Sequence, residues 1–235
     1  MKKIPLKARI IRYVCEQGIV SVEDLAAQFK SESSMDSFRV MMYQIGFTRM
    51  KYENAKYGVW CVQDPKLLDC LKKYYPELPR FQIRDASLYR VAHSLGLNYI
   101  RRTYERMKQL NITDWWTEEY IRALPCEQRK EISLRWCPDA VFWRNTKQKI
   151  FLEYERTYKN IKRYALIFRA YEKRNDIGRK SVLYICEDEI IMRRLVRVYQ
   201  KLLAGGKLRR EDLFQFTTLA SFNKIKINSR KERKE

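Results

Sequence analysis

The sequence of 235 residues predicts an α+β fold with a helix-rich N-terminal domain and a C-terminal domain built on a sheet. Three observations carry this prediction. Apolar residues recur at helical spacing from Leu6 to Ile45, and two short strand-like segments follow. Farther along, two apolar arms flank a polar loop, and a helical pattern then leads to a continuous apolar strand. The length is sufficient for two domains, or three small ones, with a sizeable core.

The charge balance predicts a polyanionic partner. Lys and Arg number 49 against 28 Asp and Glu, which leaves a formal net charge of +21. A charge this large repels itself in the compact state, and a nucleic acid relieves that repulsion. No apolar run approaches the roughly 18 residues of a membrane-spanning helix, and no signal-peptide pattern is visible. We therefore expect a cytoplasmic DNA-binding protein with no membrane partner.

Cysteine and histidine usage excludes several kinds of site. The six cysteines form no CxxC pair, so we expect free thiols in a reducing compartment rather than a zinc site. The chain has a single histidine, His93, whose helical setting favours a packing role. Relaxases and replication initiators that depend on a cluster of histidines around a metal are excluded.

The first 63 residues predict a winged helix-turn-helix domain. A first helix ends before Gly18, and Ser21 with Asp24 forms a capping box that opens a second helix. A third helix starts near Ser34, and residues 47–52 and 57–62 are expected to form a hairpin, the wing. In such domains the third helix usually enters the major groove and the wing contacts phosphates. Docking of another protein is the alternative use of this shape.

Candidate DNA contacts lie in two places. The outer face of the third helix and the wing present Ser37, Arg39, Tyr43, Gln44, Arg49, Lys51 and Lys56. Residues 64–110 are expected to be a helical connector in which Arg101 and Arg102 belong to a basic run. That run is either a solvated face or a track for phosphates.

Three acids in residues 111–222 predict a metal site. The arms of a hairpin carry Asp139 on one side and Glu153 and Glu155 on the other. Side chains alternate across a strand, so the two glutamates share a face, and pairing of the arms brings Asp139 to the same corner. Carboxylates placed together repel one another, and hard oxygen donors suit Mg²⁺ or Mn²⁺. The alternative is ordinary surface acids on two exposed strands.

The elements around these acids complete the predicted domain. We expect a helix capped by Thr113 or Asp114 that contains Glu118, and a strand at residues 132–136. After the hairpin, Thr157 is expected to cap a helix from Tyr158 to Lys173, followed by a buried strand at residues 181–186. A further helix, a strand at 213–219 and a basic tail at 223–235 close the chain.

The order strand, strand, helix, strand with acids on the first two resembles the PD-(D/E)xK nuclease superfamily, whose core is a restriction-endonuclease-like αβββαβ domain. Glu155 stands where that pattern usually has lysine, and Lys159 or Lys162 could supply the missing ammonium. A larger set of motifs resembles the replication-relaxation family, which includes MobC-type plasmid mobilisation relaxases. The motifs are Leu95–Asn98, Trp116–Glu118, Cys137–Ala140, Phe151–Thr157 and Lys159.

This resemblance implies recognition of a plasmid origin of transfer and metal-dependent nicking of one strand. It implies Mg²⁺ or Mn²⁺ held by Asp139, Glu153 and Glu155 with Glu118, and Tyr158 as the candidate nucleophile, since strand alternation turns Tyr154 to the core. The implied partners are duplex DNA, single-stranded DNA after nicking, an auxiliary DNA-binding mobilisation protein and a coupling protein. Two alternatives are a nuclease or plasmid replication factor without a covalent intermediate, and an inactive winged-helix DNA-binding regulator.

Overall fold

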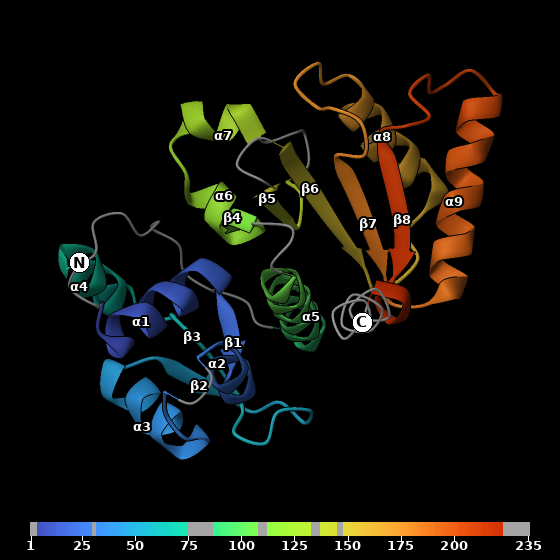
Figure 1. Ribbon diagram of the computed structural model, residues 1–235. Helices are drawn as coiled ribbons and strands as arrows, with labels where there is room; N and C mark the ends of the chain where they lie inside the picture. The colour runs from blue at the N-terminus through green and yellow to red at the C-terminus, as the bar shows by residue number, and fades with distance from the viewer. Residues whose placement is uncertain are drawn as a thin grey trace, which may run out of the picture. The chain divides into compact units, whose positions relative to one another are not determined.

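The computed structural model describes residues 4–29, 32–74, 87–107, 112–132, 137–144 and 148–222. It confirms the α+β class, with helices and two sheets (Figure 1). The chain divides into two compact units. The first unit comprises Met1–Arg102 and Trp116–Arg129, and the second comprises Thr103–Trp115 and Lys130–Glu235. Among the described residues no helix is both long and apolar enough to cross a membrane.

The first unit opens with three helices and a three-stranded sheet. The sheet is antiparallel and has the strand order β1-β3-β2. The helices α4, α5 and α6 follow in the chain, and the strand β4 lies between α5 and α6. In chain order these elements are α1 Leu6–Gln17, β1 Ile19–Ser21, α2 Val22–Gln28, α3 Met35–Ile45, β2 Thr48–Met50, β3 Val59–Cys61, α4 Pro65–Tyr74, α5 Leu88–Arg106 and α6 Glu118–Ala123.

Local signals mark the residues at which these helices begin and end, as the sequence predicts. Gly18 follows α1 with φ of 78°, a backbone conformation that favours glycine. The side chain of Ser21 accepts the backbone N–H of Asp24, and the Asp24 carboxylate accepts the backbone N–H of Ser21, so the capping box is confirmed. Ser34 caps α3 in the same way by accepting the N–H of Ser37.

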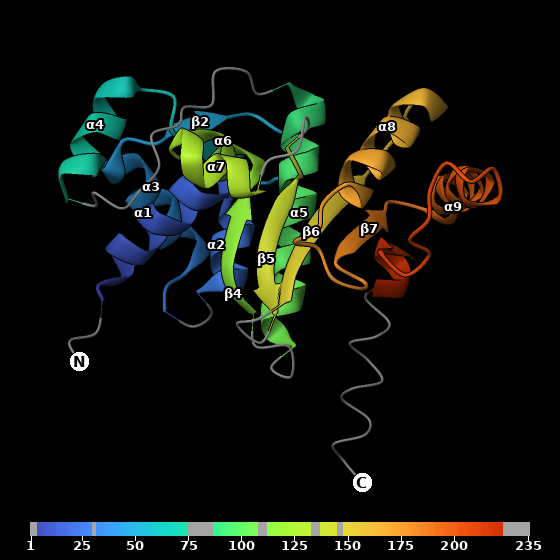
Figure 2. The same ribbon diagram turned by 90° about the horizontal axis from the view of Figure 1, so that it is seen from above.

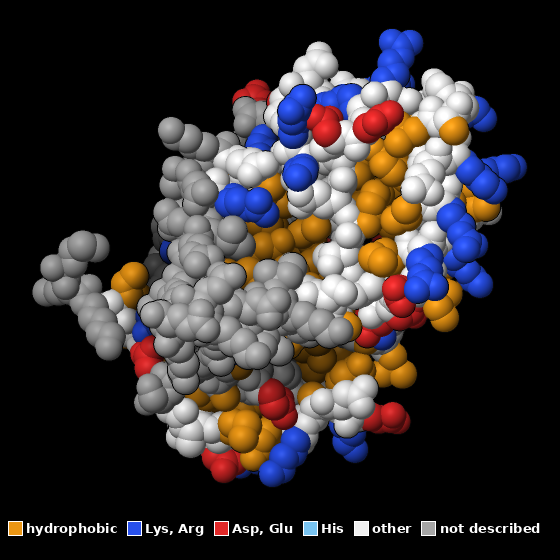
Figure 3. All heavy atoms as spheres, turned by 45° about the vertical axis from the view of Figure 1, so that its right-hand side comes forward, with side chains coloured by type: hydrophobic (Ala, Val, Ile, Leu, Met, Phe, Trp, Pro, Cys, Tyr) orange, Lys and Arg blue, Asp and Glu red, His pale blue; other side chains and the backbone are white. Residues whose placement is uncertain are grey.

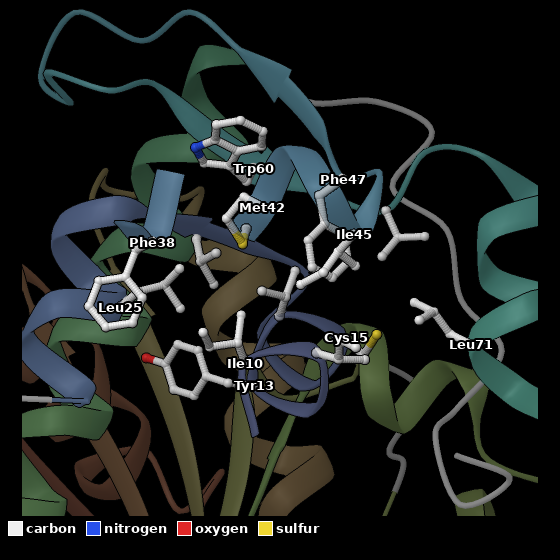
Figure 4. Packing of buried hydrophobic residues seen from close by; sticks show 14 of the residues in the cluster. Ile10, Tyr13, Cys15, Leu25, Phe38, Met42, Ile45, Phe47, Trp60 and Leu71 are labelled. Atoms are coloured by element: carbon white, nitrogen blue, oxygen red, sulfur yellow. The ribbon is translucent and has the colours of Figure 1, made fainter. Parts of the chain in front are cut away.

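The core of the first unit lies between α1 and α3 and the strand β3. Figure 4 shows the side chains of Phe38 and Met42 directed toward Ile10 and Tyr13, with Trp60 beside them. Phe38, Met42 and Ile10 are fully buried. Such close packing of large apolar groups provides most of the stability of the unit.

The helix α5 is tied to the first unit by buried polar contacts. The Asn98 amide donates to the carbonyl of Ile19 at 2.8 Å and to Asp24 at 3.0 Å, and Arg102 forms an ion pair with Asp24. The helix α4 and the part of α5 up to Arg102 group with the N-terminal helices, and the predicted connector of residues 64–110 is divided between the two units at Arg102. The contacts that hold α5 in the first unit join residues more than 70 positions apart in the chain.

The second unit is built on a five-stranded sheet of order β4-β5-β6-β7-β8. Strands β5 and β6 are antiparallel, and β6, β7 and β8 are parallel neighbours. Right-handed crossovers between successive parallel strands place α8 and α9 on the same side of the sheet (Figure 2). The elements wholly within this unit are β5 Ala140–Arg144, β6 Gln148–Glu155, α8 Ile161–Glu172, β7 Val182–Cys186, α9 Glu189–Ala204 and β8 Phe214–Thr218. The strand β4 Ile112–Thr117 and the helix α7 Cys126–Ile132 each belong in part to both units.

Three predicted elements are wrong in position. Ile112–Thr117 is a strand rather than the start of a helix, and Thr117 caps the helix that follows. The helix α8 begins at Ile161 behind Asn160, whose side chain accepts the N–H of Lys162, so Thr157 is not its cap. Ile132 ends a helix, and residues 133–136 of the predicted strand lie outside the described residues, as does the tail 223–235.

Candidate functional site

Asp139 and Glu153 face each other across the β5–β6 hairpin. The register pairs Ala140 with Leu152, which sets Asp139 opposite Glu153 on the same face of the sheet. The backbone N–H of Tyr154 donates to Oδ2 of Asp139 at 2.7 Å, so the aspartate is fastened to the neighbouring strand. Glu155 lies two residues beyond Glu153 on the same face and is 1% exposed. The hairpin thus gathers the three acids that the sequence analysis named.

The setting of Glu153 favours its neutral form. Burial raises the pKa of Glu153 well above its usual range, and the nearby carboxylate of Asp139 raises it further. The hydroxyl of Tyr171 donates to Oε1 of Glu153 at 2.5 Å. A positive charge placed beside Glu153 therefore stabilises its ionised form.

Lys159 supplies a positive charge to this corner. Its ammonium donates to Oε1 of Glu155 at 2.5 Å. Burial alone would lower the pKa of Lys159, but the carboxylates of Glu155, Asp139 and Glu153 raise it above the usual value, so the ammonium stays charged. Lys162, the other lysine considered for this role, is exposed on α8.

We call Asp139, Glu153, Glu155 and Lys159 the acid cluster. Three adjacent carboxylates form an all-oxygen donor set of the kind that Mg²⁺ and Mn²⁺ prefer, and their mutual repulsion is what a divalent cation relieves. The donors therefore fit such an ion in chemical kind. In arrangement, no group of three or more His, Cys, Asp or Glu side chains in the described part of the chain is disposed to hold a metal. Protein donors engage all three carboxylates instead.

Glu118 belongs to the first unit, whereas the residues of the acid cluster belong to the second. It occupies the first turn of α6, where a negative charge is favourable, and its Oε1 accepts two hydrogen bonds from Arg122, at 2.7 Å and 2.5 Å. These contacts account for Glu118 without a metal, and its role as a fourth ligand stays a prediction.

Three tyrosines lie in or beside the segments that carry the acid cluster, and the hydroxyl groups of Tyr154 and Tyr164 form hydrogen bonds within the unit. Tyr154 is 3% exposed, as strand alternation predicts, and its hydroxyl donates to Glu187. The hydroxyl of Tyr164 accepts the backbone N–H of Lys159 at 3.0 Å. Burial raises the pKa of both hydroxyls. Tyr158 is half-buried in the segment before α8, with its ring centroid 5.4 Å from that of Tyr164.

A second candidate surface lies on the first unit, where α3 meets the β2–β3 hairpin. Arg49 donates to the carbonyl of Tyr57 at 2.9 Å and lies 3.5 Å from the hydroxyl of Tyr43. Lys56 and Arg39 lie over the ring of Tyr57, at 5.2 Å and 6.0 Å from its centroid. Contacts therefore join these five side chains, the wing cluster, into a basic and aromatic patch. Ser37, Gln44 and Lys51 are exposed on the same two elements.

Arg101 and Arg102 occupy internal positions instead. Arg101 lies 3.4 Å from Glu16 with its guanidinium over the ring of Tyr13, and Arg102 pairs with Asp24. Their side chains are 12% and 11% exposed. Both charges are neutralised within the unit, so the DNA surface proposed below does not include them.

The chain was compared with protein-family models, curated proteins and solved structures. No match was found. What the protein does is therefore argued from the acid cluster and the wing cluster.

Two features of the second unit lie outside the sequence-based predictions, and only one of them carries a signal in the sequence. Tyr171 reaches Glu153 from 18 residues farther along the chain, through the packing of α8, and no local pattern marks it. The basic face of α9 did carry a signal, since Arg194, Arg197 and Lys201 recur at the spacing of one helical face. The same spacing is also typical of the solvated face of an amphipathic helix.

Proposed function

We propose that this protein binds DNA through its first unit and nicks one strand in a divalent-metal-dependent reaction, as a plasmid mobilisation relaxase acting at an origin of transfer. The acid cluster carries the proposal. Three carboxylates and one ammonium share a largely buried corner, and such a combination is unfavourable for folding alone. Buried charged groups that shift one another's pKa are typical of sites that bind and transform charged substrates.

The element order supports the nuclease part of the proposal. In the second unit β4, β5 and β6 precede α8 and β7 along the chain. This is the order βββαβ, the part of the αβββαβ pattern of a PD-(D/E)xK-like domain that follows its first helix. Asp139 and Glu153 stand at the two acid positions of that pattern. Lys159 brings an ammonium to Glu155, where the pattern usually has lysine.

In the proposed reaction each residue has a separate role. Asp139 and Glu153 would hold a Mg²⁺ or Mn²⁺ ion, with Glu155 anchoring Lys159 beside them. When bound, the ion would supply Lewis-acid stabilisation of the charge that develops on the scissile phosphate. The Tyr158 hydroxyl would release its proton to water and its oxygen would attack phosphorus, the bond from phosphorus to the leaving 3′ oxygen would break, and that oxygen would take up a proton from water. The tyrosine is then joined to the 5′ phosphate, so the energy of the phosphodiester is retained.

The first unit supports the DNA-binding part. The order α1, β1, α2, α3, β2, β3 with a sheet of order β1-β3-β2 is that expected of a winged helix. In this arrangement α3 presents Ser37, Arg39 and Gln44 to the bases, and the hairpin presents Arg49, Lys51 and Lys56 to phosphates. The net charge of +21 favours association with any DNA, and the base contacts would select the site.

A second candidate is a DNA-binding regulator without catalysis. Its supporting observation is that Asp139, Glu153 and Glu155 each have an internal donor, as a purely structural cluster would. In that case the wing cluster is the functional surface and the acids stabilise the hairpin. A nuclease or replication factor that uses water in place of Tyr158 is the intermediate case.

Incubation with supercoiled plasmid that carries the native origin region tests the proposal. The reactions contain Mg²⁺, Mn²⁺ or EDTA and are stopped with detergent, with and without protease. The relaxase is expected to give metal-dependent open circles with protein attached to the 5′ end. Asp139→Asn should abolish them, whereas Asp69→Asn, a change at an exposed acid of α4, should not. Cleavage without attached protein indicates the nuclease, and binding without cleavage by the wild type indicates the regulator.

A further inference from the structure

A pocket of about 310 Å³ lies in the second unit between the segment before α8 and the helix α9. Its volume is at the lower end of the range for small-molecule pockets, so it accommodates a single base and sugar rather than a duplex. The lining residues are Tyr158, Ile161, Arg194, Arg197, Val198, Lys201, Leu202, Gly205 and Lys207. The acid cluster occupies a different place, and none of its four side chains lines the pocket.

The lining combines apolar surface with cationic groups. Ile161, Val198 and Leu202 provide the apolar part, and Ile161 is 57% exposed, which is unusual for a large aliphatic side chain. Arginine and lysine provide four positive charges, and the described lining includes no Asp or Glu. On the face seen in Figure 3, Lys and Arg side chains gather along the right-hand edge beside exposed hydrophobic side chains. A ligand that suits this lining is anionic and carries a flat apolar group.

Tyr158 gives the pocket a flat wall. The guanidinium of Arg194 lies 5.6 Å from the centroid of the Tyr158 ring. Aromatic rings and guanidinium planes are the surfaces on which proteins stack unpaired bases, because every base has a π-face. Arg197, Lys201 and Lys207 around this wall suit the phosphates on either side of a stacked base.

The chain joins this pocket directly to the acid cluster. Tyr158 lines the pocket, and the next residue, Lys159, donates to Glu155. A strand that places one base in the pocket would therefore have its neighbouring phosphates near the acid cluster. An intact duplex offers no unstacked base, so only single-stranded or locally opened DNA can use the pocket.

We propose that the pocket formed by Tyr158, Ile161 and the basic face of α9 binds one unpaired nucleotide of single-stranded DNA next to the acid cluster. The inference rests on the proposed function, because it presumes a DNA substrate. It adds the strand state of that substrate and the residues that recognise it. An anionic lipid surface is the competing occupant for a basic and apolar pocket.

The decisive comparison uses two fluorescent 12-mers of equal charge, one of thymidine nucleotides and one with abasic sites throughout. Binding to the full chain is measured by anisotropy in EDTA, so that cleavage plays no part. The wild type is expected to bind the thymidine oligonucleotide about tenfold more tightly than the abasic one, as stacking of one base provides. Tyr158→Ala should remove this difference, and Tyr158→Phe should keep it because the ring remains.

A matched pair of lysines tests the phosphate contacts. Lys201 and Lys173 are both exposed and lie at the C-terminal ends of α9 and α8. For the thymidine oligonucleotide, Lys201→Gln should reduce the slope of log K against log salt by about 0.7, the value of one single-strand phosphate contact. Lys173→Gln should leave the slope unchanged. Near-UV circular dichroism of each variant verifies that the fold is retained.

The outcomes separate this inference from the proposed function. If Tyr158→Ala leaves the preference for bases over abasic sites intact, or if the wild type has none, the pocket does not bind a base. Tyr158-dependent sedimentation with phosphatidylserine vesicles, without Tyr158-dependent DNA binding, would replace the nucleotide by a lipid headgroup. Base preference that depends on Tyr158, in a protein that nicks no plasmid, would keep the pocket and overturn the relaxase.

Discussion

The ammonium of Lys159 lies 2.5 Å from Oε1 of Glu155, and the two side chains are 21% and 1% exposed. A buried carboxylate held by one lysine depends strongly on that lysine. In the wing cluster the ion pair of Arg39 with Asp36 is exposed, with side chains 43% and 69% accessible, and Arg49 donates to the backbone carbonyl of Tyr57. The two surfaces therefore respond to substitution in different ways.

Replacement of Lys159 by methionine should destabilise the second unit. Removing one partner leaves Glu155 buried without a counter-charge, which lowers the free energy of unfolding by about 3 kcal/mol. Lys162→Met, at an exposed position of α8, should change it by less than about 0.5 kcal/mol. Urea denaturation followed by fluorescence measures both. Equal stability of the two variants would mean that the Lys159–Glu155 pair is not formed in solution.

Replacement of Glu153 by glutamine should change the pH dependence of stability. Because burial and Asp139 raise the pKa of Glu153, the folded state holds the proton more tightly than the unfolded state does. Stability from this group is full below the unfolded pKa of about 4.3 and is lost as pH rises through the raised folded pKa.

Glu153→Gln, which has no such proton, should therefore show a smaller loss of stability on going from pH 5 to pH 8 in EDTA. The glutamine can still accept the hydrogen bond from Tyr171. Denaturation curves at the two pH values give the difference between variant and wild type. A steeper loss in the variant would contradict the assigned electrostatics.

Replacement of Asp139 by asparagine should separate folding from catalysis. The asparagine carbonyl can still accept the N–H of Tyr154, so stability should stay within about 1 kcal/mol of the wild type. Loss of a metal-binding charge removes several kcal/mol of transition-state stabilisation, so the rate of nicking should fall at least a hundredfold. Plasmid-nicking rates over a Mg²⁺ titration measure this, and a rate within tenfold of the wild type would remove Asp139 from the metal site.

Neutralising the wing should weaken binding to duplex DNA. Arg49→Gln combined with Lys56→Gln removes two phosphate contacts, so the slope of log K against log salt should fall by about 1.8. Lys7→Gln, on the exposed side of α1, serves as a control and should have no effect. Anisotropy titrations with a labelled duplex at four salt concentrations give the slopes. An unchanged slope would favour a protein-docking role for the first unit.

Arg102 should behave as a structural residue. Its guanidinium is paired with Asp24, which is 4% exposed and also accepts from Ser21 and Asn98. Arg102→Leu should lower the free energy of unfolding of the first unit by about 3 kcal/mol, because it leaves Asp24 buried without a cation. Duplex affinity measured well below the melting temperature should stay the same. A weaker affinity in a fully folded variant would return Arg102 to the DNA surface.

Features governed by neighbours in the chain could be predicted from the sequence. The capping box of Ser21 and Asp24 depends on residues three positions apart, and it was predicted correctly. The convergence of Asp139 and Glu153 follows from strand alternation and a hairpin, and the register confirms it. In both cases the information lies within about 15 residues of chain.

Features decided by packing could not be predicted from the sequence. The segment from Ile112 to Thr117 carries β-branched and aromatic residues that favour a strand, but Thr113 and Asp114 also resemble a helix cap. Stacking of Trp115 on Phe142, with centroids 5.0 Å apart, belongs to the sheet. The helix α8 begins at Ile161 rather than at the predicted Tyr158, because Lys159 bonds to Glu155 from a non-helical segment. Neither contact can be read from a local pattern.

The adjacency of Tyr158 and Lys159 makes the pocket and the acid cluster thermodynamically linked. A shift of the Tyr158 backbone on nucleotide binding would also move the adjoining backbone of Lys159. If a divalent cation displaces Lys159 from Glu155, nucleotide affinity in the pocket changes by some factor, and cation affinity must change by the same factor when the nucleotide binds. Two adjacent residues would thus make metal loading responsive to the presence of an opened strand.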